Sequence, residues 1–106
     1  MQIVNDSISF NSFDGSGPRS DSKNVSLPAN ATQAVAILTG FNAAFSPSDD
    51  DHHLGNLDIR LTANFVNPTP STLVVVKATF GLRDWSGEWD DNYEGWIEFI
   101  VIGIAE

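Results

Sequence analysis

The chain has 106 residues, of which 42% are hydrophobic and 18% charged, with a formal net charge of −9. These values predict one folded domain, residues 1–106, and exclude a disordered chain. Only five residues are Lys or Arg, so we expect neither nucleic acid nor an anionic membrane surface as partner, because both need clustered cations. The chain has no Cys for disulfides or thiolate metal sites, and no apolar segment approaches the ~18 residues of a membrane span.

Six strands separated by turn signals are predicted, and no segment has a helical period. The predicted strands are 2–10, a short strand at 25–27, 34–41, 57–66, 73–82 and 96–105. The predicted loops are 11–23, 46–55, 67–70 and 83–95, and Pro28 is expected to end the second strand. This rhythm of strands and turns favours an all-β fold, a six-stranded antiparallel β-sandwich.

The strand at 57–66 alternates cleanly between apolar and polar residues. Its apolar positions, Leu57, Ile59, Leu61, Ala63 and Phe65, are expected to face inward, and Asp58, Arg60, Thr62 and Asn64 outward. The third, fifth and last strands do not alternate in this way. In the last strand Ile97, Phe99 and Val101 fall on one face, and Trp96, Ile100, Ile102 and Ile104 on the other. Because both faces need cover, these strands predict an oligomer.

The loop Asp49-Asp50-Asp51-His52-His53 combines carboxylates, which suit Ca²⁺, with imidazoles, which suit Zn²⁺ or Ni²⁺. Its spacing matches no established ligand pattern, so we expect a solvated hairpin loop with no bound metal. If an ion is bound, these five residues are where it binds.

The turn at 83–95 carries acids and aromatics. Paired carboxylates among Asp84, Glu88, Asp90, Asp91 and Glu94 would suit glycoside hydrolysis, but an acidic surface turn is the preferred interpretation, and no nucleophile or phosphate-loop motif is present. We therefore expect no enzyme and no cofactor. The aromatics Trp85, Trp89 and Tyr93 either stack on a sugar or pack beneath the turn, and Trp96, inside the predicted strand, is assigned to packing.

Four stretches carry a resemblance to the H-type lectin family. They are Lys23–Leu27, Ala34–Phe41, the strand start Asn56-Leu57, and Glu88-Trp89-Asp90-Asp91 before the last strand. The resemblance covers about residues 23–105 and is one of pattern, with few identities. It implies a six-stranded sandwich that forms trimers, sometimes stacked into hexamers, and binds galactose or N-acetylgalactosamine at clefts between subunits.

Some of the family's sugar-binding positions carry over to this chain. Trp89 matches the family's cleft Trp, and Asp90 matches the sugar-contacting residue after it. Asp58 stands where the family has Arg, and Arg60, two residues on, shares its face and is the expected substitute. The family's Asp contact lies in the N-terminal loop, where Asp21 is a candidate beside Asp14 and Gly17, none of which aligns uniquely.

The expected function is therefore a carbohydrate-binding module without catalysis, with glycans as partners and a location outside the cell or on its surface. The alternative is a structural or adhesive sandwich of a bacterial or phage surface protein that keeps the fold and does not bind sugar.

Overall fold

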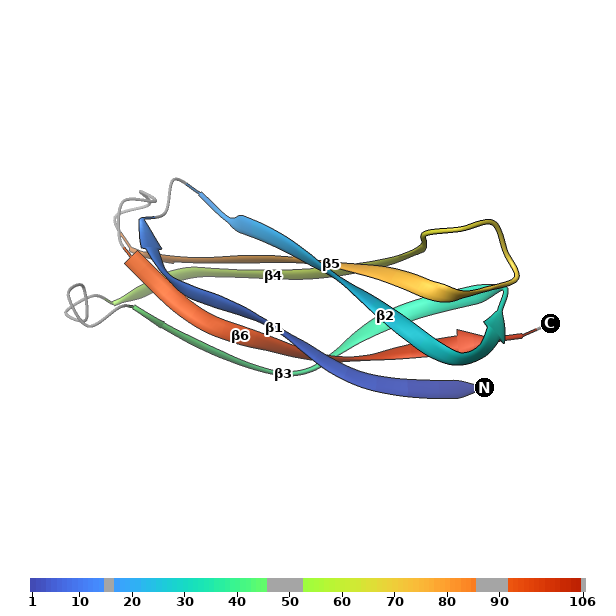
Figure 1. The fold of residues 1–106 in the computed structure, drawn as a ribbon. Helices are drawn as coiled ribbons and strands as arrows, with labels where there is room; N and C mark the ends of the chain where they lie inside the picture. Colours follow the sequence, from blue (N-terminus) through green and yellow to red (C-terminus); the bar gives the residue numbers. More distant parts are fainter. Residues whose placement is uncertain (15–16, 46–52, 86–91, 106) are drawn as a thin grey trace.

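The computed structural model describes residues 1–14, 17–45, 53–85 and 92–105. The fold is all-β, with six antiparallel strands in two three-stranded sheets that pack as a β-sandwich (Figure 1). The strands are β1 (Gln2–Asp14), β2 (Arg19–Ala31), β3 (Gln33–Phe45), β4 (Leu54–Phe65), β5 (Ser71–Asp84) and β6 (Asn92–Ile104). The predicted sandwich of six antiparallel strands is thereby confirmed.

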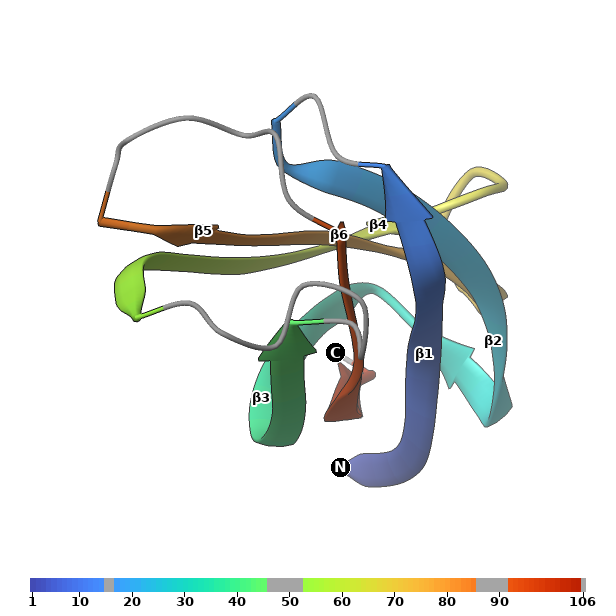
Figure 2. The same cartoon turned by 90° about the vertical axis from the view of Figure 1, so that its left-hand side faces the viewer.

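The sheets have the strand orders β1–β6–β3 and β2–β5–β4, so β6 and β5 are the central strands. Figure 2 looks along the sandwich, with β4 and β5 crossing above β3 and with β1 and β2 on the right. The molecule is elongated, 50 × 20 × 18 Å. Strands β1, β3 and β5 end, and β2, β4 and β6 begin, at the end opposite the two termini (Figure 1).

The core lies between the inner faces of the two central strands. Its most deeply buried side chains, each at most 1% exposed, include Val74, Val76, Ala78 and Phe80 of β5 and Tyr93, Ile97, Phe99 and Val101 of β6. Full burial of a large apolar side chain stabilises the fold by roughly 1.5–3 kcal/mol. These two rows therefore provide much of the stability that holds the sheets together.

The alternation predicted for β4 is confirmed. The inward positions Leu57, Ile59, Leu61, Ala63 and Phe65 all pack against the core. Arg60, Thr62 and Asn64 are exposed, and Asp58 is half-buried on the same outward face. Since β4 is an edge strand, its inward residues are only partly covered.

The second strand is longer than predicted, and the loop expected at 11–23 is wrong at both ends. β1 continues to Asp14 and β2 begins at Arg19, although residues 19–24 are nearly all polar. These residues pair in continuous register with β5, from Arg19 opposite Phe80 to Asn24 opposite Val75. Pairing with a strongly β-forming neighbour has overridden the weak local propensity of the polar residues.

Pro28 does not end β2, contrary to expectation. The strand extends to Ala31, but the register with β5 shifts between Ser26 and Ala31. β2 is an edge strand, where a proline without an N–H can be accommodated at an irregularity of the ladder.

β3 owes its two-sided apolar character to a bulge. Its pairing with β6 shifts between Leu38 and Gly40. Before the shift Ala34 and Ala36 face the core, and after it Ala43 and Phe45 do so. One extra residue in a strand exchanges the faces to which the following side chains point. Each half of β3 therefore directs some of its apolar side chains to the core and the others to the outer face.

Tyr93 and Arg19 link the two sheets at the end away from the termini. The buried Tyr93 hydroxyl lies 2.9 Å from the carbonyl oxygen of Gly17 and 3.2 Å from that of Phe80, and shares its proton between them. From β2, Arg19 donates to the carbonyl oxygens of Tyr93 (2.7 Å) and Asn11 (2.8 Å). Its guanidinium carbon lies 4.6 Å from the Tyr93 ring centroid, so a hydrogen-bonded and cation–π contact joins β2 to both β1 and β6.

The first prediction tests this link with Tyr93→Phe, which removes only the hydroxyl. We expect a loss of about 1–2 kcal/mol in the free energy of unfolding, because buried carbonyls lose a donor. Urea denaturation at fixed protein concentration measures it. Ser20→Ala is the control, because it removes an exposed hydroxyl that contacts Thr79 and should change stability by less than about 0.5 kcal/mol. Equal effects of the two substitutions would contradict the proposed link.

Candidate functional site

The outer face of the β2–β5–β4 sheet is polar. Strand pairing creates three outward rows across it: Ser20–Thr79–Arg60, Ser22–Lys77–Thr62 and Asn24–Val75–Asn64. Of these nine side chains only Val75 is apolar. A face of this composition is stable in water without a partner.

Two of the predicted sugar-binding residues lie together on this face. Arg60 Nε donates to Asp58 Oδ1 at 3.0 Å, and the Arg60 side chain is 74% exposed. The expected sharing of one outward face by these two residues is therefore observed. The pair presents a guanidinium with further N–H donors to solvent, which suits hydroxyl or carboxylate ligands.

Asp21 is not brought to this pair. It lies on β2, two strands away, opposite the inward-facing Ala78. Asp21 accepts a hydrogen bond from the Ser22 amide (2.8 Å) and lines a shallow hollow of about 200 Å³ with Ser20, Ser22 and Lys77. Trp89 and Asp90, the other predicted sugar contacts, lie outside the described residues.

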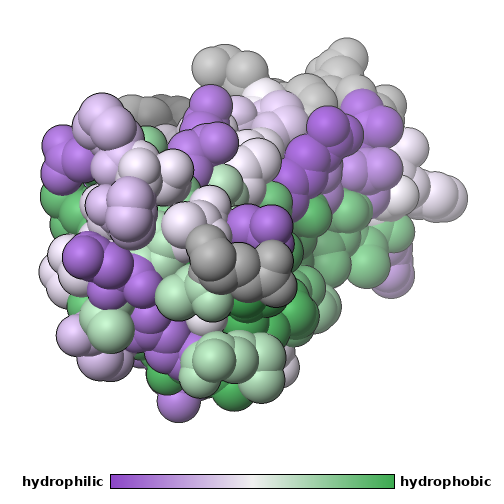
Figure 3. All heavy atoms as spheres, turned by 90° about the vertical axis from the view of Figure 1, so that its right-hand side faces the viewer, coloured by the Kyte–Doolittle hydropathy of each residue, from purple (hydrophilic) through white to green (hydrophobic). Residues whose placement is uncertain are grey.

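The outer face of the β1–β6–β3 sheet is apolar at the end near the termini. Pairing creates the rows Ile3–Ile102–Val35 and Asn5–Ile100–Ile37, with Ile104 beyond them. Ile3, Val35 and Ile37 are 55%, 47% and 43% exposed. In Figure 3, seen from the end with the termini, hydrophobic residues gather at the lower centre and right, and hydrophilic ones lie along the left side and at the upper right. We call the set Ile3, Val35, Ile37, Ile100, Ile102 and Ile104 the apolar end.

A second apolar surface lies at the open edge between β3 and β4. It is a groove of about 400 Å³ lined by Phe41, Ala43, Ala44, Phe45, Leu54, Leu57 and Leu82. Phe41 and Leu54 are 49% and 63% exposed. Apolar side chains are therefore exposed in two places, at the apolar end and in this groove, with Leu38 of β3 between them.

Further along the outer face of β1–β6–β3, the character of the surface changes from apolar to polar. A hollow of about 730 Å³ is lined by Asn5, Asp6, Ser7, Ser9, Thr39, Trp96, Glu98 and Phe99. Small residues flank β6 at this point: Glu98 pairs with Ser7 of β1 on one side and with Gly40 of β3 on the other. Their short side chains leave space on the outer face.

Trp96 is the functional candidate that sequence reasoning missed. It was assigned to packing, but its side chain is 44% exposed, on the wall of this hollow. Its indole Nε1–H donates to Glu98 Oε1 at 2.9 Å. The sequence did contain a signal for this exposure. Side chains alternate between the two faces of a strand, so Trp96 falls on the face opposite the core residues Ile97 and Phe99. Tyr93, by contrast, is fully buried against Phe80, so of the two alternatives predicted for it, packing is the one observed.

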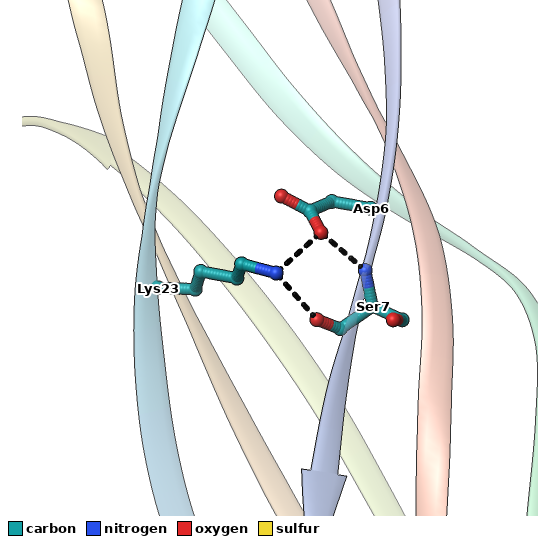
Figure 4. Close-up of polar contacts among 3 residues, drawn as sticks. All are labelled: Asp6, Ser7 and Lys23. Carbon is teal, nitrogen blue, oxygen red and sulfur yellow. Dashed lines mark hydrogen bonds and ion pairs between the residues drawn. The ribbon is translucent and has the colours of Figure 1, made fainter.

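Asp6 and Lys23 bridge the two sheets at the margin of the hollow. Lys23 Nζ donates to Asp6 Oδ1 (2.6 Å) and to the Ser7 carbonyl oxygen (3.3 Å), and the Ser7 amide donates to the same Asp6 oxygen (2.8 Å) (Figure 4). Partial burial acts to raise the pKa of Asp6. The bonds from Lys23 and Ser7, with the Lys23 charge, outweigh it, so the pKa of Asp6 lies below its ordinary value.

The metal loop and the paired carboxylates considered from the sequence lie largely outside the described residues. Asp49 to His52 are not described, and the exposed His53 meets Trp85 edge-on, with ring centroids 6.0 Å apart. Among the described residues no three His, Asp or Glu side chains are grouped to hold a metal. Asp84 is buried and Glu94 half-buried, while Glu88, Asp90 and Asp91 are not described. No helix in these ranges is long and apolar enough to cross a membrane.

Comparison with known proteins adds no relative. No protein-family model matches the chain, and neither a curated protein nor a solved structure matches it.

The second prediction concerns pH. Because the folded-state pKa of Asp6 is lowered, its contribution is present above the unfolded value, about 3.9, and is lost as the pH falls through the folded value. Asp6→Asn should cost under about 1 kcal/mol at pH 7, and this difference from the unmodified protein should vanish in acid below the folded pKa. Denaturation between pH 7 and pH 2 measures it.

Lys23→Gln is the partner variant for this test. It should lose the shared ion pair as well, and the double variant should lose less than the sum of the two single losses, because both substitutions remove the same Lys23–Asp6 bond. Additive losses would show that the two side chains act separately.

Proposed function

We propose that this chain is a carbohydrate-binding module that assembles into a ring of three subunits, or a hexamer of two rings, and acts without catalysis or a cofactor. The observation that carries the proposal is the contrast between the outer faces of its two sheets. One is largely polar on all three strands, and the other has the apolar end, in which Ile3, Val35 and Ile37 are exposed on the two edge strands and the isoleucines of β6 between them are half-buried.

The presence of two different apolar surfaces supports a ring. A two-fold dimer uses one self-complementary patch, whereas a ring needs two different patches that meet head to tail. The apolar end and the β3–β4 groove are such a pair. Charge supports only a modest interface, since a net charge of −9 per subunit opposes close approach.

The Asp58–Arg60 pair supports sugar binding beside a subunit boundary. Leu57, the residue before Asp58, lines the β3–β4 groove from the inward face of β4, and the pair lies on the outward face of the same edge strand. A subunit docked in the groove that also covers the edge of β4 would therefore reach the pair. There Arg60 would donate to sugar hydroxyls and Asp58 would accept from them, with Trp89 and Asp90 as further contacts. This agrees with the inter-subunit cleft that the H-type lectin resemblance implies.

The alternative, a structural or adhesive module without sugar binding, is favoured by one observation. Asp58 is already engaged by Arg60 at 3.0 Å, so the pair is satisfied without a ligand. Asp58 also stands where the resemblance implies an Arg.

The third prediction tests assembly. Ile102→Glu, at the apolar end, and Leu54→Glu, in the groove, should each dissociate the oligomer, because an unpaired buried charge costs several kcal/mol. Sedimentation velocity at micromolar concentration should give a trimer or hexamer for the unmodified chain and a monomer for each variant.

Val75→Glu is the matched control, because Val75 is an apolar residue on the otherwise polar outer face of the opposite sheet. It should leave the sedimentation coefficient unchanged. A monomeric unmodified chain would refute the assembly, and dissociation by only one of the two variants would refute the ring.

The fourth prediction tests sugar binding on a glycan array that includes galactose and N-acetylgalactosamine. The unmodified chain should bind, and Arg60→Ala and Trp89→Ala should each abolish the signal while leaving the melting curve and sedimentation unchanged. Loss of one charged hydrogen bond costs roughly 1.5–3 kcal/mol, which removes a weak signal even with multivalent display.

Thr62→Ala is the control, because Thr62 is exposed on the same face of β4 and should bind as the unmodified chain does. No binding to any glycan would favour the structural alternative. Binding that survives both site variants would exclude the Asp58–Arg60 site.

A further inference from the structure

We propose that the hollow lined by Trp96 and Glu98 is a second saccharide site, which takes the ring of a neutral sugar and does not involve Asp58 or Arg60. It lies on the opposite sheet from that pair. Neither composition nor the lectin resemblance points to it.

The aromatic wall is available for stacking. Trp96 is 44% exposed and lines the hollow. Its N–H, the polar part of the indole, is occupied by Glu98, so the ring presents apolar surface to the hollow. The same hydrogen bond limits rotation of the ring, and less conformational freedom is lost when a flat apolar partner stacks on it.

Glu98 has one oxygen left for a ligand. Oε1 accepts from Trp96, and Oε2 makes no hydrogen bond within the described ranges. This second oxygen lies above Gly40, 3.1 Å from the position that a Cβ on Gly40 would occupy. A carboxylate oxygen held beside an aromatic ring is a strong acceptor for a sugar hydroxyl.

The remaining lining supplies neutral polar groups. The side chains of Asn5, Ser7, Ser9 and Thr39 line the hollow and make no side-chain hydrogen bond to another described residue. Amide and hydroxyl groups both donate and accept. One apolar wall and several polar groups that can do both match the two-sided surface of a pyranose, with its C–H face and its hydroxyl rim.

Charge decides against other ligands. Asp6 and Glu98 both line the hollow, and the Lys23 ammonium at its margin is engaged by Asp6, so a phosphate or carboxylate ligand would meet uncompensated negative charge. An apolar ligand would leave these carboxylates desolvated. A small cation would suit Trp96 and Glu98, but would leave the hydroxyl and amide lining unused.

The site is compatible with assembly through the apolar end. On β6 the apolar end begins at Ile100 and runs toward Ile104, whereas Glu98 and Trp96 lie on the other side of Ile100. From Ile100, the nearest residue of the apolar end on β6, Glu98 lies roughly 7 Å and Trp96 roughly 14 Å along the strand, at about 3.4 Å per residue. The lining residue Asn5 stands opposite Ile100, so the hollow and the apolar end are neighbours. Because paired sheets twist, surfaces that meet at one end diverge toward the other.

The test follows the Trp96 indole N–H signal by two-dimensional ¹H–¹⁵N NMR, identified by its absence in Trp96→Leu. The intact chain is titrated with the methyl glycosides of galactose, glucose, mannose and N-acetylglucosamine, and separately with tetramethylammonium. We expect at least one glycoside to shift the signal saturably, with an affinity that added salt does not change. Glu98→Gln should weaken binding at least tenfold, and Arg60→Ala should leave it unchanged.

Binding to Trp96→Leu is measured by calorimetry with the same glycoside and should be lost. Four results would overturn the site: no shift with any of the four glycosides, binding retained by Trp96→Leu, a shift with tetramethylammonium alone, or dissociation of the oligomer by Trp96→Leu, which would make Trp96 an interface residue. If no glycoside binds the hollow but the glycan array is positive and depends on Arg60, the proposed function stands and this second site does not. If a glycoside binds the hollow and the array signal does not depend on Arg60, this hollow is the sugar site.

Discussion

The packing of β5 against β6 is the constraint on which the rest of the structure depends. Each is the central strand of its sheet, and their inner rows, from Val74 to Phe80 and from Tyr93 to Val101, are almost completely buried. Every other strand is an edge strand that pairs with one of these two. The polar residues at the start of β2 are extended because β5 offers them a ladder, and the bulge of β3 keeps apolar residues directed toward the core along its length.

A sandwich of two three-stranded sheets covers only the inner faces, so its outer faces decide what the molecule contacts. Here the two faces have opposite character. The polar face carries Ser, Thr, Asn and the Asp58–Arg60 pair, all compatible with water. The other face changes along its length, from exposed isoleucines near the termini to Trp96, Glu98 and hydroxyl groups beyond them. An evenly polar face would suit a monomer, whereas a graded face suits contact with a partner at one end and a small ligand at the other.

Two of the few cationic side chains of this protein connect the two sheets at the margins of the sandwich. Lys23 joins the sheets at the margin of the hollow, and Arg19 joins them at the far end through the carbonyl oxygen of Tyr93. Arg60 remains largely exposed and, among the described residues, is paired with Asp58. Its further N–H donors face solvent on the polar face, where they are available to a ligand with oxygen acceptors.

The number of strands and the alternation of β4 were determined by the sequence alone, because a strand with one wet face must alternate with period two and turn residues mark its ends. The apolar character of both faces of the last strand likewise indicated surface beyond the core, since one chain of this size can cover only one face of each sheet. Other features depended on pairing between distant segments. The length of β2 depends on β5, the face exchange in β3 depends on its register with β6, and the separation of Asp21 from Arg60 depends on the strand order. The exposure of Trp96 and its bond to Glu98 were also decided by the tertiary structure, because periodicity distinguishes the two faces of a strand, and only the packing of the sheets determines which of them is buried.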